Sequence, residues 1–275
     1  MKPQLFITIL LLMACFNVAS ADVGAIYNAH IAWKTAFEGV DIAAVETIWS
    51  HTADTTLITL DGKQKNGWKE IQATLFLSFQ LTGETNISES NLLITLSGNT
   101  ASATSDYRWS PLPDVPLSAT ELYRKEDGVW KMIAQDGTGG LEPLRRDDET
   151  QLREQVQQTH DALVGADLDA LLGLIADDFT YIALNGTVHR EFEKAIIGSD
   201  LGKIRNLRLK VIYLTDDSAT AIDTLTLADD ERDIQLVYNT DWKLKTINFA
   251  PSSLAVGPNR KIATRWARIK TQTPD

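Results

Sequence analysis

The chain has 275 residues, of which 44% are hydrophobic and 23% are charged. This composition is typical of globular proteins and too apolar for a disordered chain, and the length allows one or two domains. The 37 acidic and 26 basic residues give a net charge of −11. Nucleic acid is therefore not expected as a partner, because the chain has no excess of cations to neutralise phosphates.

The first 21 residues are typical of a secretory signal peptide. A short basic start precedes an apolar run over residues 5–16, which is too short to span a bilayer, and Ala19 and Ala21 form a small-x-small cleavage site. Cleavage after Ala21 would export the protein to the periplasm or the medium and remove its only cysteine, Cys15. An alternative stays open, in which the same region is a lipoprotein signal and Cys15 carries a lipid anchor. No later stretch predicts a transmembrane helix.

The first helix after this segment has one apolar face. Ile26, His30, Trp33 and Phe37 follow one another at intervals of four, three and four residues, which places them on one stripe. A histidine on such a face is either a buried structural residue or, in a pocket, a candidate for proton transfer. His30 is therefore a candidate catalytic residue.

The next elements follow from caps and turns. Gly39 is expected to end the first helix as a left-handed C-cap, and Asp41 to start the second helix as its N-cap. Asp61-Gly62 after a strand-like run predicts a hairpin. A third helix follows, with apolar residues at helical spacing, Trp68, Ile71, Leu75 and Phe79.

Two later strands of this half carry polar groups on an apolar face. Alternation places Ser105 and Tyr107 on one side with Ala101, Ala103 and Trp109. The same counting places Asp136 with Trp130 on the last strand. We therefore expect a pocket in which the ligand-binding residues Trp33, Tyr107 and Asp136 converge with His30.

The same order of signals then occurs a second time. Residues 162–171 align with residues 36–45, Asn185-Gly186 predicts a second hairpin, and residues 240–245 resemble the earlier strand 128–133. The alignment pairs His160 with Lys34, off the apolar stripe, and we expect His160 to be solvated. Gly and Pro between the copies indicate a linker.

The second copy has its own candidate site. Asp223 is the one carboxylate on an otherwise apolar strand face, so burial would raise its pKa and let it act as an acid, with Tyr181 as a further polar group. A structural alternative is an Asp223 bonded to a neighbouring group. Counting along the last strand places Asn248 on the same face as Leu244, which makes Asn248 a candidate ligand-binding residue.

Several kinds of chemistry are not indicated. The chain has four histidines and no cysteine beyond Cys15, and it contains no His-Glu-x-x-His sequence, so no metal site is expected. No Gly-x-Ser-x-Gly or phosphate-binding Gly-rich sequence occurs either. We expect no cofactor.

The pattern Trp33-x-x-Ala36-Phe37-x-x-x-Asp41, with the Gly-x-Trp-Lys strand at 128–131, resembles the SnoaL-like branch of the nuclear transport factor 2 (NTF2) superfamily. The resemblance implies an α+β fold of two tandem cone-shaped domains, each with three helices packed in a strongly curved antiparallel sheet around a pocket. Members include isomerases, dehydratases, cyclases and epoxide hydrolases, and also proteins that only bind ligands.

This resemblance sets the expected domain boundaries. They are a signal peptide (1–21), a first SnoaL-like domain (22–136), a linker (137–148), a second SnoaL-like domain (149–250) and a basic C-terminal tail (251–275). Such domains often carry a histidine on the last strand, six residues after its tryptophan. Asp136 and Asn248 stand there instead, so a mechanism that uses that imidazole is not expected in either copy.

These observations lead to one expected function and two alternatives. We expect an exported protein that binds a small apolar ligand or a partner, with the two copies paired as an internal pseudo-dimer. An isomerase, dehydratase or cyclase that uses acid-base chemistry on a small hydrophobic substrate is the second interpretation. A purely structural protein of the cell envelope is the third.

Overall fold

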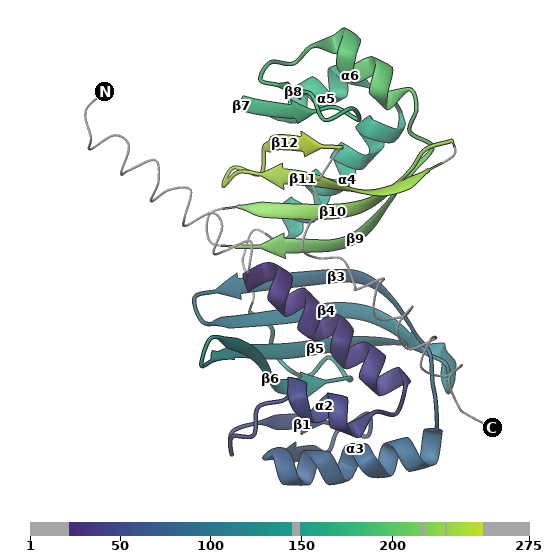
Figure 1. The fold of residues 1–275 in the computed structure, drawn as a ribbon, viewed down its shortest axis with the longest axis vertical. Coiled ribbons are helices and arrows are strands. Elements are labelled where there is room, and N and C mark those ends of the chain that lie inside the picture. The colour runs from purple at the N-terminus through teal and green to yellow at the C-terminus, as the bar shows by residue number, and fades with distance from the viewer. Residues whose placement is uncertain (1–21, 145–148, 216–217, 229, 250–275) are drawn as a thin grey trace, which may run out of the picture.

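The computed structural model describes residues 22–144, 149–215, 218–228 and 230–249. The predicted signal peptide and the basic tail therefore lie outside the described residues. The fold is α+β, with one large mixed sheet flanked by helices (Figure 1). Within the described part of the chain, no helix is long and apolar enough to cross a membrane.

The two halves of the chain repeat one order of elements. The first half begins with a helix over residues 22–38 and continues with α2 (Ile42–Ile48), β1 (Thr56–Ile58), β2 (Gln64–Asn66), α3 (Trp68–Thr82), β3 (Ile87–Ser97), β4 (Thr100–Trp109), β5 (Leu112–Glu126) and β6 (Val129–Asp136). The second half has α4 (Glu149–Val164), α5 (Leu168–Leu174), β7 (Ile175–Ile182), β8 (Val188–His189), α6 (Lys194–Leu201), β9 (Asn206–Leu214), β10 (Ala219–Thr226), β11 (Glu231–Tyr238) and β12 (Leu244–Asn248).

The predicted N-cap at Asp41 is confirmed, but the predicted C-cap conformation at Gly39 is wrong. Asp41 accepts a hydrogen bond from the backbone N–H of Ala44 at 2.9 Å, as a capping side chain should. The left-handed residue is not Gly39 but the next one, Val40, with φ of 60°. At Gly39 itself the space is tight, because an added Cβ would lie 3.3 Å from the carbonyl oxygen of Thr35.

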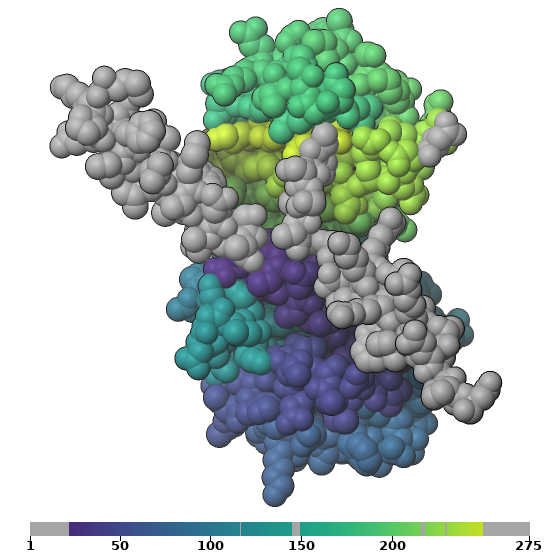
Figure 2. Space-filling view, in the orientation of Figure 1, coloured from purple at the N-terminus to yellow at the C-terminus, as the bar shows by residue number. Residues whose placement is uncertain are grey.

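The strands form one twelve-stranded sheet in the order β2-β1-β6-β5-β4-β3-β9-β10-β11-β12-β7-β8. In each half the first strand pairs in parallel with the last, β1 with β6 and β7 with β12. The halves join where β3 pairs in parallel with β9, from Leu92 opposite Val211 to Thr95 opposite Leu214. Figure 2 shows the second half, green to yellow, stacked on the first half, purple to teal.

The two hydrophobic cores lie on opposite faces of this sheet. On β3, Leu92 and Ile94 belong to the core of the first half, whereas Leu93 between them belongs to the core of the second half. On β9, Val211 and Ile212 divide in the same way. Successive residues of a strand point to opposite faces, so the helix 22–38 covers one face of the sheet and α4 covers the other (Figure 1).

Candidate functional site

The first half contains a pocket of about 380 Å³. Its walls come from the helix 22–38, the β1–β2 hairpin, α3 and the strands β3 to β6, and most of the wall is aromatic or aliphatic. His30, Trp33 and Tyr107 line it together, although they are far apart in the sequence. Three of the four residues predicted to converge in the first copy therefore do so.

A buried histidine bridges two carboxylates at one side of this pocket. Nδ1 of His30 lies 2.8 Å from Oε2 of Glu121 on β5, and Nε2 lies 2.9 Å from Oε1 of Glu89 on β3. Ionised carboxylates only accept hydrogen bonds, so both ring nitrogens of His30 must donate. His30 is therefore an imidazolium held between two glutamates.

Electrostatics support this protonation state. Burial alone would lower the pKa of His30, but the charge and hydrogen bond of Glu121, together with the hydrogen bond and charge of Glu89, outweigh it and raise the pKa to about 10. Burial would raise the pKa of Glu89, yet the hydrogen bond and charge of His30 lower it below its usual value, helped by Ser105 and Lys34. Glu89 is thus held as a carboxylate.

Tyr123 completes the network from the neighbouring position on β5. Its hydroxyl donates to Oε2 of Glu121, and both side chains are almost completely buried. Burial, followed by the charge of Glu121 and the hydrogen bond to it, raises the pKa of Tyr123 well above its ordinary value. The tyrosine therefore stays a neutral donor to Glu121.

Strand β4 contributes two further donors to the pocket, Trp109 and Tyr107, the latter paired with Glu89 of β3. Burial, with the charges of Asp136 and Glu121, raises the pKa of Tyr107 to about 12. Nε1 of Trp109 is buried and has no hydrogen-bond partner among the described residues. Gly137 leaves room for this wall, because an added Cβ would lie 2.8 Å from the hydroxyl of Tyr107.

Asp136 is fully buried but does not line the pocket, although Gln135 and Gly137 on either side of it do. Its Oδ1 accepts hydrogen bonds from the N–H and the hydroxyl of Thr138, both at 2.6 Å, and its Oδ2 accepts one from the N–H of Leu141. Through these hydrogen bonds Asp136 holds the start of the predicted linker against the end of β6.

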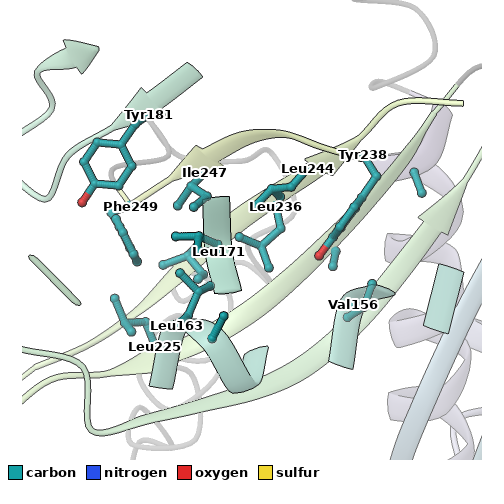
Figure 3. Close-up of a cluster of buried hydrophobic side chains, with 14 of the residues drawn as sticks. Val156, Leu163, Leu171, Tyr181, Leu225, Leu236, Tyr238, Leu244, Ile247 and Phe249 are labelled. Carbon is teal, nitrogen blue, oxygen red and sulfur yellow. The ribbon is translucent and has the colours of Figure 1, made fainter. Parts of the chain in front are cut away.

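The second half fills the corresponding space with leucine. The pairing of β4 with β5, and of β10 with β11, makes Leu236 the counterpart of Glu121 and Tyr238 the counterpart of Tyr123. The counterparts of Tyr107 and Glu89 are Leu225 and Leu207. Leu236 and Leu225 are completely buried in the core that Figure 3 shows.

Asp223 is completely buried on β10, and His160 on α4 lies beside it. Nε2 of His160 is 3.0 Å from Oδ1 of Asp223, an ion-pair distance, although the two atoms are not aligned for a hydrogen bond. The expectation of a solvated His160 is wrong, because only 9% of the residue is exposed. His160 follows the buried Leu152 and Val156 at intervals of four residues, so it lies on the buried face of α4.

Tyr181 and Asn248 lie elsewhere in the second half. The hydroxyl of Tyr181 donates to Oδ2 of Asp200 at 2.8 Å. The expectation that Asn248 shares a face with Leu244 is wrong: Tyr238 pairs with Leu244 but Val237 pairs with Thr246, so a bulge skips one residue of β12. A one-residue shift exchanges the faces of a strand, and the buried residues after it are Ile247 and Phe249 (Figure 3).

Sequence reasoning missed the two glutamates of the His30 network. Glu121 shares one face of β5 with Ala119 and Tyr123, and a carboxylate at such an inward-facing position was a usable signal. For Glu89 the signal was weaker, because β3 has a register shift between Ser90 and Leu93 that interrupts its alternation. Among the described residues, no group of three His, Cys, Asp or Glu has the arrangement of a metal site.

No family model matches the sequence, and no curated protein matches it. Solved structures do resemble it. A candidate dehydratase of the NTF2-like family from Streptomyces avermitilis is 19% identical, over 44% of this chain and 98% of its own, with a TM-score of 0.40. A candidate ketosteroid isomerase from Shewanella frigidimarina is 20% identical, over 40% of this chain and 90% of its own, with a TM-score of 0.36.

A third similar structure is an NTF2-like protein of unknown function from Pseudomonas putida. It is 22% identical, over 48% of this chain and 92% of its own, with a TM-score of 0.39. Each of these structures spans less than half of this chain. The chain is thus similar to NTF2-like structures, the superfamily that the sequence resembles.

Proposed function

We propose that the protein binds a small, largely apolar molecule in the pocket of its first half. The observation that carries this proposal is the pocket of about 380 Å³, whose apolar wall is interrupted by a few polar groups. Small-molecule sites have this size and make-up. The second half, with leucines at the matching positions, is the structural partner, and the two halves form an internal pseudo-dimer of SnoaL-like domains.

Filling the pocket with a larger side chain tests this function. Ala119 lines the pocket from β5, whereas Ser118 is exposed and points to the other face of the sheet. The neutral fluorescent dye prodan should gain intensity with the wild-type protein and with Ser118→Phe, and not with Ala119→Phe. Circular dichroism establishes that each variant is folded. Equal dye binding by both variants would place the ligand elsewhere and refute the proposal.

Acid-base catalysis in the same pocket is the second candidate. The observation that favours it is Glu89, a carboxylate held in its ionised form by His30 and paired across neighbouring strands with the neutral phenol of Tyr107 in the pocket wall. Such a base would remove a proton from a carbon next to a carbonyl group. Deuterium uptake from D₂O into a bound cyclic ketone, followed by NMR and lost in Glu89→Gln, tests this candidate; uptake equal to that in buffer refutes it.

Export is proposed from the N-terminal sequence. The residue after the proposed cleavage site, Asp22, is already anchored in the folded body: its Oδ1 accepts hydrogen bonds from Nζ of Lys125 at 2.6 Å and from Nε1 of Trp130 at 3.1 Å. Mass spectrometry of the exported protein should show a chain that begins at Asp22. A lipid-modified Cys15 would refute a soluble exported form and support the anchored alternative.

A further inference from the structure

We propose that the ligand of the first pocket is an organic amine, an apolar body that carries a protonated amino group and places it on Glu89. This inference rests on the proposed function and adds the chemical class of the ligand. It follows from the hydrogen-bonding capacity and from the charge of the groups around His30.

The N–H and O–H groups of His30, Tyr123 and Ser105 are all engaged, so these three side chains offer a ligand no donor. Both ring N–H groups of His30 are used by Glu89 and Glu121. The hydroxyl of Tyr123 is used by Glu121, and that of Ser105 by Glu89. Each carboxylate can accept about four hydrogen bonds, so what remains for a ligand is acceptor capacity. A ligand that reaches the His30 side of the pocket must therefore bring a donor.

The charge at this side of the pocket selects a cation among donors. Two carboxylates, Glu89 and Glu121, face one imidazolium, and all three side chains line the pocket at 13% exposure or less. Among these three groups one negative charge is in excess, and the other cation that acts on Glu89 is the partly exposed Lys34. A protonated amine supplies the missing charge and a charge-assisted hydrogen bond, which is stronger than a neutral one.

The walls fit the same ligand. The rings of Trp33, Phe37, Tyr107 and Trp109 line the pocket, and aromatic faces attract ammonium groups. Lys34 also lines the pocket, but it is partly exposed, so water screens its charge more than that of the buried Glu121. Of the carboxylates that line the pocket, Glu121 is buried and Glu89 is partly buried, with 13% of its side chain exposed.

Three indoles of nearly equal shape test the inference. Tryptamine, indole-3-ethanol and indole-3-propionate carry an ammonium, a hydroxyl and a carboxylate group on the same ring system. Isothermal titration should give tryptamine the highest affinity, on the order of tenfold above the alcohol, and the carboxylate the lowest. Glu89→Gln should remove the preference for tryptamine and keep binding of the alcohol.

A matched control removes the same charge on the other face of the sheet. Asp106 is exposed on β4 and bonds to Asn91 and Ser118, away from the pocket, so Asp106→Asn should leave the preference unchanged. Lys34→Met, which leaves the buried network intact, should raise the affinity for tryptamine several-fold, and it serves as the second variant if Glu89→Gln does not fold.

The outcomes separate this inference from the proposed function. Equal or tighter binding of the alcohol or the carboxylate overturns the inference, as does an unchanged preference in Glu89→Gln or weaker tryptamine binding in Lys34→Met. Prodan binding in the pocket with no binding of tryptamine also overturns it, and leaves the proposed function standing.

Discussion

His30 should make the stability of the protein fall as the pH rises. Its pKa in the folded protein is about 10, against an ordinary value of 6.5. Because the folded value is the higher one, the stabilisation is complete below pH 6.5 and is lost as the pH rises towards 10. At about 1.4 kcal/mol per pH unit, this interval amounts to roughly 5 kcal/mol.

Urea denaturation between pH 6.5 and 9 measures this loss before tyrosines begin to ionise. The free energy of unfolding of the wild type should fall by about 3 kcal/mol more than that of His30→Gln over this range. His51→Gln, at an exposed histidine, serves as the control and should follow the wild type. The NMR signal of the His30 ring provides an independent reading in the unmutated protein.

Two results would refute this reasoning. If the unfolding free energies of the wild type and of His30→Gln run parallel from pH 6.5 to 9, no proton is bound more tightly in the folded state. If the ring of His30 titrates near pH 6.5, the two glutamates do not hold it as an imidazolium.

Three further predictions concern single side chains. Glu121→Leu should destabilise the protein by about 2 to 5 kcal/mol in urea denaturation, because it leaves the Nδ1–H of His30 and the buried hydroxyl of Tyr123 without an acceptor; a loss below about 1 kcal/mol would contradict a charged His30. Leu225→Ala should cost about 2 to 5 kcal/mol through the cavity that it leaves in the second core, while prodan binding stays unchanged; weaker dye binding would argue against a pocket confined to the first half. Gly137→Ala should weaken prodan binding, since the new methyl group pushes Tyr107 into the pocket, and unaltered affinity would contradict that placement.

The local patterns of the sequence were sufficient to predict the elements. The stripe from Ile26 to Phe37 is the buried face of the first helix, and Asp41 caps the second helix as predicted. The glycine of each predicted turn has a positive φ, 77° at Gly62 and 83° at Gly186. These signals depend on residues a few positions apart, so they can be recognised in the sequence without the tertiary structure.

Positions next to a bulge were not predictable in this way. Alternation predicts Asn248 on the inner face, but one residue of β12 is skipped in its pairing with β11, and this skip exchanges the faces of the residues after Leu244. Alternation is reliable only along an uninterrupted strand. The extra residue of a bulge is set by the register against a neighbouring strand, which no local pattern of β12 contains.

By itself, then, the sequence determined the order of the elements, their repetition and the inward position of His30. Only the tertiary structure decided that β3 pairs with β9, that the two cores take opposite faces of one sheet, and that Glu89 and Glu121 meet His30 from 59 and 91 residues away. The physical reason is the distance along the sequence over which each interaction acts. Helix spacing and turns are determined by near neighbours, whereas the charge state of a buried histidine depends on side chains that long-range strand pairing brings to it.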